Sequence, residues 1–156
     1  MIAVVPVRDG APDPGGPEGI AEAGGRAILI GSGVRDALGV IPGDTREVQL
    51  AETAGYRPAA WAAALAPLLE NEPIVVIPAS PDGRDLAPRL AVLLGRDFAA
   101  GALQVTAETI TLAVVGLHAQ RVLTRSGPTV VTLLPSARAW LAGPADRAAV
   151  REIALA

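Results

Sequence analysis

The residues best suited to chemistry lie in one stretch, PASPDGRDLAPRLAVLLG, which spans residues 78–95. A turn-rich segment there runs into an amphipathic helix, and in open α/β sheets ligands bind where such loops lead into helix N-termini. Backbone N–H groups and the helix dipole favour a phosphate at that place, and an arginine adds positive charge. The candidate cofactor-binding residues are therefore Ser80, Asp82, Gly83 and Arg84.

The same stretch has a second interpretation as an ordinary helix start. Asp85 can cap the helix, and it forms a favourable i, i+4 pair with Arg89. With Asp85 as the N-cap, Pro88 falls at the third helical position, where no intrahelical donor is needed. This interpretation predicts that residues 82–84 lie in the loop and that Gly83 only turns the chain.

Other catalytic signals are few. The segment Gly31-Ser32-Gly33 lacks the third glycine of a dinucleotide fingerprint and is typical of a tight turn from strand to helix. His118 is the single histidine, so we expect an ordinary polar residue there, with a catalytic base as the alternative. The chain has neither cysteine nor lysine, which excludes thiolate chemistry, disulfides, lysine Schiff bases and a P-loop lysine. We expect no catalytic residue and no metal site.

Composition is typical of one globular domain. The chain has 156 residues, of which 51% are hydrophobic, and this length suffices for a single core. No apolar run approaches the roughly 18 residues of a membrane span, and the N-terminus lacks the pattern of a signal peptide. A net charge of −3 gives no reason to expect nucleic acid or an anionic membrane as a partner. The absence of cysteine is compatible with the cytoplasm, which is the expected location.

Short apolar runs predict strands at residues 2–7, 27–31, 47–51 and 73–78, and most of these runs are nearly continuous, as in parallel strands buried on both faces. Apolar residues at i, i+4, i+7 and i+8 predict two helices, within residues 57–72 and 86–94. The predicted buried stripes are Trp61, Leu65, Leu68 and Leu69, and Leu86, Leu90, Leu93 and Leu94. Alternating strands and helices predict an α/β fold, an open, mostly parallel sheet with helices on both faces.

The sequence changes character after Gly95. Alternating β-branched residues predict strands at residues 103–106, 109–115, 119–124 and 129–134, which extend or edge the same sheet, although alternation does not tell their order. The segment GPADRAAVREIALA, residues 143–156, predicts a terminal helix. Residues 10–19 are rich in proline and glycine and predict a loop.

Three stretches carry a resemblance to a known family: AILIGSGVRDAL (27–38), VVIPASPDGRDLAPRLAVLLG (75–95) and GPTVVTLLPSARA (127–139). The middle one resembles the most recognisable segment of the N-terminal domain of the electron transfer flavoprotein alpha subunit, with its pattern G-R-D-L-x-P-R-x-A-x-x-L. The first is similar to that domain's second strand, glycine turn and helix, and the third to its closing strand and turn. A narrower likeness is to the branch associated with mycofactocin-dependent oxidoreductases.

This resemblance implies an adenine-nucleotide alpha-hydrolase-like fold and a heterodimer of alpha and beta subunits. It implies that FAD is held mainly by a C-terminal domain of the alpha subunit and AMP by the beta subunit. The complex accepts electrons from acyl-CoA or other dehydrogenases and passes them to a quinone reductase or another acceptor. Residues 1–156 form a single domain that ends before such an FAD domain, so we expect no FAD on this chain alone. Residues 78–85 occupy the position of the beta subunit's AMP loop, and we expect their pocket to be empty.

Two functions of different classes remain open. The first is a non-catalytic scaffold domain of the alpha subunit, which pairs with a beta subunit in a complex whose FAD carries out the redox chemistry. The alternative is a stand-alone adenine-nucleotide-binding α/β module, which requires residues 31–33 and 78–85 to converge on one pocket. A small hydrolase or lyase is disfavoured, because cysteine and lysine are absent and histidine occurs once.

Overall fold

Ten strands of the computed structural model form one sheet within residues 1–155, the part of the chain that the structure describes. The first half contains β1 (Ile2–Arg8), β2 (Ala11–Pro12), α1 (Gly16–Glu22), β3 (Arg26–Gly31), the 3-10 helix η1 (Asp36–Val40), β4 (Glu47–Glu52), α2 (Pro58–Leu69) and β5 (Ile74–Pro78). The second contains α3 (Pro81–Leu94), β6 (Asp97–Val105), β7 (Thr109–Val114), β8 (Ala119–Thr124), β9 (Thr129–Leu133) and β10 (Ala149–Glu152).

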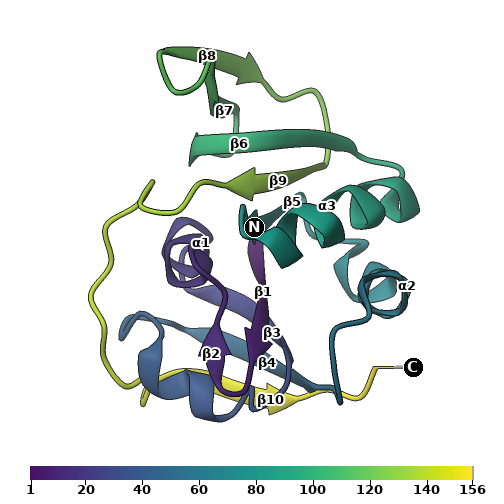
Figure 1. Ribbon diagram of the computed structural model, residues 1–156, viewed down its shortest axis with the longest axis vertical. Coiled ribbons are helices and arrows are strands. Elements are labelled where there is room, and N and C mark those ends of the chain that lie inside the picture. The colour runs from purple at the N-terminus through teal and green to yellow at the C-terminus, as the bar shows by residue number, and fades with distance from the viewer. Residues whose placement is uncertain (156) are drawn as a thin grey trace.

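The strand order is β10-β4-β3-β1-β5-β9-β6-β7-β8, with β2 beside β1. Every neighbouring pair from β10 to β6 is parallel, whereas β7 and β8 continue the edge as antiparallel strands. Helix α1 packs on one face of the sheet, and α2 and α3 pack on the other (Figure 1). The predicted α/β class, with a mostly parallel sheet, is confirmed.

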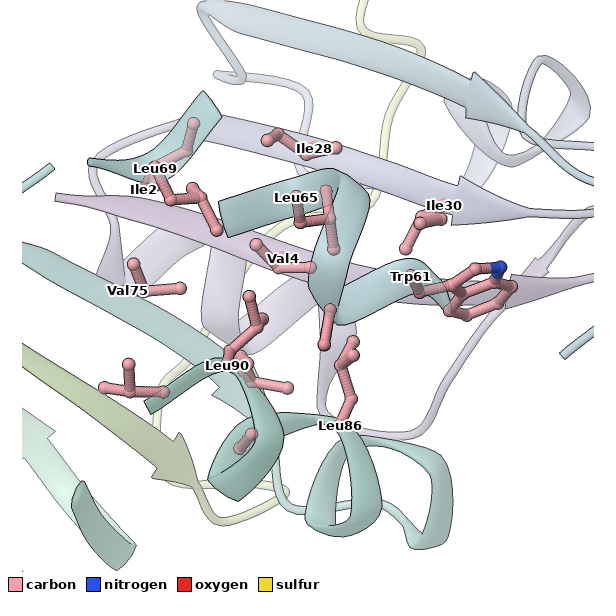
Figure 2. Packing of buried hydrophobic residues seen from close by; sticks show 14 of the residues in the cluster. Ile2, Val4, Ile28, Ile30, Trp61, Leu65, Leu69, Val75, Leu86 and Leu90 are labelled. Atoms are coloured by element: carbon pink, nitrogen blue, oxygen red, sulfur yellow. The ribbon is translucent and has the colours of Figure 1, made fainter. Parts of the chain in front are cut away.

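Strand β1 is buried on both faces because its alternate side chains serve two separate cores. Ile2 and Val4 belong to the cluster under α2 and α3, while Ala3, Val5 and Val7 belong to the cluster under α1 and η1. Figure 2 shows the first cluster, in which Trp61, Leu65 and Leu69 of α2 and Leu86 and Leu90 of α3 meet Ile2, Val4, Ile28, Ile30 and Val75 of three strands. This two-sided burial explains why the sequence of β1 is continuously apolar.

Two leucines of the predicted helix stripes are not buried. Leu68 is 45% exposed and Leu93 is 54% exposed, whereas Leu65 and Leu90 are fully buried. Each exposed leucine lies seven residues after the first residue of its stripe. At about 100° per residue this puts it at the edge of the buried face, away from the line that contacts the sheet. Neither these helices nor α1 is long and apolar enough to cross a membrane, within the residues described.

The strands predicted after Gly95 are confirmed, but the predicted terminal helix is wrong. Residues Ala149–Glu152 form β10, which pairs in parallel with Glu47–Leu50 of β4. The open edge of β4 offers unpaired backbone groups, and pairing with them outweighs a weak local helix preference. The predicted loop at residues 10–19 likewise contains β2 and the start of α1, where Gly15 adopts φ 86° and a proline lies in the first turn.

The contrast between Leu65 and Leu68 makes a direct test of α2 packing. We expect Leu65→Ala to lower the free energy of unfolding by about 2–5 kcal/mol, because it leaves a cavity under the helix. The matched change Leu68→Ala, in the same helix and with the same lost atoms, should cost less than about 1 kcal/mol. Urea denaturation of both variants checks this, and equal losses would contradict the observed orientation of α2.

Candidate functional site

The candidate site lies at the carboxyl ends of β1, β3 and β5. Strand β1 sits between the other two, and the chain leaves this edge toward α1 on one face and toward α3 on the other (Figure 1). Ligands of open α/β sheets bind in the crevice formed at such a switch point. Arg8 ends β1, while Ser32 and Ser80 follow the ends of β3 and β5, so polar side chains gather there.

Helix α3 starts earlier than the capping pattern of Asp85 predicts. Ser80 is the N-cap, and its Oγ accepts a hydrogen bond from the Gly83 N–H at 3.0 Å. Pro81 occupies the first helical position, where the missing N–H costs nothing. Residues 82–84 therefore form the first turn of the helix rather than a loop, which corrects the prediction. The expected pair between Asp85 and Arg89 is present, with 2.9 Å between Oδ1 and Nη2.

Gly83 is needed for packing, because a Cβ atom built on it would lie 1.9 Å from the Pro78 carbonyl oxygen. The helix thus begins directly against the end of β5, and no side chain fits between them. Gly31 has a comparable role at the end of β3, with φ 142° and a built Cβ 1.9 Å from the Val7 carbonyl oxygen. Both glycines bring neighbouring backbones close together.

Asp82 closes the crevice by pairing with Arg8. The carboxylate accepts hydrogen bonds from Arg8 Nη2 at 2.6 Å and from Nε at 2.9 Å. The guanidinium also lies over the ring of Tyr56, 5.5 Å from its centroid, and the Tyr56 hydroxyl donates to the Asp82 carbonyl oxygen at 2.9 Å. Burial, together with Asp85 and Asp82, raises the pKa of Tyr56, which keeps its hydroxyl a donor. The ion pair thus joins Arg8 of β1 to Asp82 of α3, which lie 74 positions apart in the sequence.

Ser80 and Arg84 have different surroundings. The Ser80 hydroxyl is buried and donates to Asp13 Oδ2 at 2.6 Å. Arg84 is exposed and lines a separate groove of about 310 Å³, together with Phe98 and Thr132. The structure therefore brings Ser80, Asp82 and Gly83 together at the start of α3, where Asp82 reaches Arg8, whereas Arg84 lines the neighbouring groove.

The segment Gly31-Ser32-Gly33 is held by side chains of the same chain. Glu52, at the end of β4, accepts hydrogen bonds from the Gly33 N–H at 2.8 Å and the Val34 N–H at 3.0 Å. Ser32 Oγ accepts from the Asp9 N–H at 2.8 Å and donates to Asp9 Oδ1 at 3.0 Å. The predicted tight turn is confirmed, although the helix after it is only the short 3-10 helix η1.

The crevice as it stands does not fit a nucleotide phosphate. The backbone donors of Gly33, Val34 and Gly83 already have acceptors within the chain, and Arg8 is paired with Asp82. A phosphate there would also meet carboxylates, which repel it. Among residues 1–155, no group of histidine, aspartate and glutamate side chains is arranged to hold a metal ion.

His118 and a further groove lie away from this edge of the sheet. His118 is exposed in the turn between β7 and β8, where its N–H donates to the Val115 carbonyl oxygen. A groove of about 820 Å³ runs along the segment between β9 and β10, with Arg138, Trp140 and Arg147 in its lining. Arg138 forms an ion pair there with the buried carboxylate of Glu22, with 3.0 Å between Nη1 and Oε2.

The sequence patterns did not identify four residues that shape the crevice, namely Arg8, Asp13, Glu52 and Tyr56. A signal for two of them exists in the sequence, because Arg8 and Glu52 are the last residues of their strands. The carboxyl ends of parallel strands share one edge, so polar residues at these positions are candidates for the crevice. Tyr56 and Asp13 lie in loops, and only the fold shows that they belong there.

The close contact at Gly83 predicts that a larger residue there lowers the stability of the fold, whether or not a ligand is bound. We expect Gly83→Ala to lower the free energy of unfolding by about 1–3 kcal/mol, because the added methyl group overlaps the Pro78 carbonyl. Gly39→Ala is the control, since a Cβ built on Gly39 has no other atom within 4 Å. Chemical denaturation compares the two, and a stable Gly83→Ala variant would contradict the close contact.

The surroundings of Asp13 predict that the stability of the fold depends on pH. Burial raises the pKa of Asp13, while the hydrogen bond from Ser80 acts in the opposite direction. A carboxyl whose pKa is higher in the folded than in the unfolded state stabilises the fold at low pH, and this contribution to the free energy of unfolding is lost as the pH rises through the folded-state pKa. Asp13→Asn keeps an acceptor for Ser80, so we expect it to be more stable than the parent at neutral pH and equal to it in acid.

Urea denaturation across a pH series measures this difference. Asp97→Asn, at an exposed aspartate of β6, serves as the control for the loss of one charge. An advantage of Asp13→Asn that grows toward acid pH would contradict the assigned direction.

Comparison with known proteins supports the family suggested by the sequence motifs. A family model described as the electron transfer flavoprotein domain matches residues 20–156, which is most of the chain. No curated protein matches the chain significantly. The matched region includes β3, β5, α3 and β9, the elements that contain the three similar stretches. The chain therefore belongs to the electron transfer flavoprotein family, whose N-terminal domain occurs in both alpha and beta subunits.

Proposed function

We propose that this chain is the N-terminal domain of an electron transfer flavoprotein alpha subunit, which pairs with a beta subunit in a complex that carries electrons through FAD. The match to the family model over residues 20–156 is the observation that carries this proposal. Residues 83–94, GRDLAPRLAVLL, fit the alpha-subunit pattern G-R-D-L-x-P-R-x-A-x-x-L at every specified position, which supports alpha over beta.

Within the complex the domain acts as a scaffold and not as the redox centre. Bound FAD supplies the electron chemistry, and we propose that other parts of the complex hold it. The internal hydrogen bonds of the crevice support this division, because they use the donors that a phosphate would need. Acyl-CoA or other dehydrogenases are the proposed electron donors, and the cytoplasm is the proposed location.

In the same proposal, Ser80, Asp82, Gly83 and Arg84 are the remnant of a nucleotide-binding loop. Ser80 and Gly83 now fasten the start of α3 to β5, and Asp82 fastens α3 to β1 through Arg8. AMP is assigned to the beta partner. A stand-alone nucleotide-binding module would need residues 31–33 and 78–85 free to face a common ligand, and both segments are bonded to neighbouring side chains instead.

Pairing and ligand content can be tested in one preparation. We expect a tagged form of this chain, co-expressed with a beta subunit from the same genome, to retain that subunit through purification. An unrelated α/β protein with the same tag is the control bait. The chain purified alone and then denatured should release neither AMP nor FAD, as measured by mass spectrometry.

Each outcome has a different meaning. Failure to retain the beta subunit overturns the heterodimer. Release of AMP or ATP from the chain alone favours the nucleotide-binding module, and release of FAD assigns to this domain a cofactor site that the proposal places elsewhere.

A further inference from the structure

Helix α2 is apolar on every side although half of it faces solvent. Its sequence, PAAWAAALAPLL, has no charged or hydrogen-bonding side chain apart from the indole of Trp61, which is buried. The solvent side is formed by Ala59, Ala60, Ala63, Pro67 and Leu68. A helix that is apolar all round is normally covered on all sides. Figure 1 shows α2 at the outer edge of the molecule, and Ala59, Ala60 and Ala63 are exposed among the residues described.

A groove and a ridge lie side by side next to this face. The groove, of about 490 Å³, runs between α2 and α3 and has Ala59, Ala62 and Ala63 on one wall. Pro88, Arg89, Val92 and Leu93 of α3 form the other wall, from which Val92 and Leu93 stand out, 80% and 54% exposed. Small residues on one helix allow close approach, and large ones beside them supply a ridge to fill a groove. A two-fold interface brings the same surface of both copies together, so a ridge of one copy can enter a groove of the other.

The charges at the two ends of α2 also point to a second copy. Arg57 comes directly before the helix and Glu70 directly after it, and both are exposed without an ion pair to any residue in 1–155. These charges oppose the helix dipole, which favours an anion at the N-terminus and a cation at the C-terminus. Within one molecule they are therefore mildly unfavourable.

An antiparallel neighbour reverses that effect. A two-fold axis near Ala63 and Ala64 places each Arg57 beside Glu70 of the other copy, because the two residues are equally distant from that centre. Each charge then also faces the helix end that attracts it. The span from residue 57 to residue 70 is about 20 Å, enough for a continuous helix contact. At the crossing point alanines of the two helices meet.

We propose that a second copy of this chain docks on the face formed by α2 and the Val92–Leu93 ridge, with the two α2 helices antiparallel. This homodimer is additional to the proposed pairing with a beta subunit and does not depend on it. The contact is apolar at its centre and has two Arg57–Glu70 pairs at its rim, which is the usual composition of a protein interface.

The oligomeric state of the purified chain, measured by sedimentation equilibrium, tests the proposal. We expect a dimer for the parent chain and a monomer for Ala63→Glu, because two carboxylates would meet at the crossing point. Ala119→Glu, which adds the same charge at an exposed position of β8, should remain dimeric. Circular dichroism confirms that each variant is folded.

A charge exchange separates docking from folding. We expect R57E to weaken dimerisation by about tenfold, since both symmetric pairs become repulsive. E70R should do the same, and the double variant R57E/E70R should restore the parent affinity. Both single changes favour the helix dipole, so they do not weaken α2 itself.

Two results would overturn the proposal. One is a parent chain that is monomeric at every concentration. If Ala63→Glu then also abolishes retention of the beta subunit, the face belongs to that subunit instead. The other is a dimer that R57E leaves unchanged, which would place the contact on another face. Loss of beta-subunit binding with an intact dimer would instead count against the proposed heterodimer alone.

Discussion

Strand β1 packs against a helix layer on each face, and the remaining elements are arranged around it. Ile2 and Val4 contact one core and Ala3, Val5 and Val7 the other. Each buried valine or isoleucine side chain contributes about 1.5–3 kcal/mol. Because both faces are used, β1 must be central, with β3 and β5 as its two neighbours. That placement brings Arg8, Ser32 and Ser80 to one edge of the sheet. The crevice is therefore a consequence of burying β1, whether or not a ligand is bound there.

The polar edge of the sheet shows how the chain pairs its own backbone donors at a switch point. Backbone donors at such an edge must be satisfied, because an unpaired buried donor costs about 1–3 kcal/mol. In this chain Glu52 and Ser80 take that role toward Gly33, Val34 and Gly83. Three residues of the G-R-D-L stretch have a role in packing or pairing within the chain. Gly83 allows contact with Pro78, Asp85 pairs with Arg89, and Leu86 is buried in the core.

The elements outside the central strands widen the sheet in both directions. Strands β9, β6, β7 and β8 extend it beyond β5, and β10 returns to the opposite edge beside β4. The segment between β9 and β10 runs along the side of the molecule, as Figure 1 shows. Its start is held by Arg138, whose partner Glu22 lies in α1 and also accepts a hydrogen bond from the Val105 N–H. One buried carboxylate thus joins α1, β6 and this segment.

Local patterns in the sequence were enough to determine the α/β class, the two long helices, the strands after Gly95 and the family. They succeeded because hydrophobic periodicity records which residues each element buries. The start of α3, the exposure of Leu68 and the strand at residues 149–152 were decided by tertiary structure. Ser80 became the cap because β5 ends against Gly83, and β10 formed because β4 offered an open edge. The partners of Arg8, Asp13 and Glu52 also came from the fold, since contacts between residues far apart in the chain leave no local pattern.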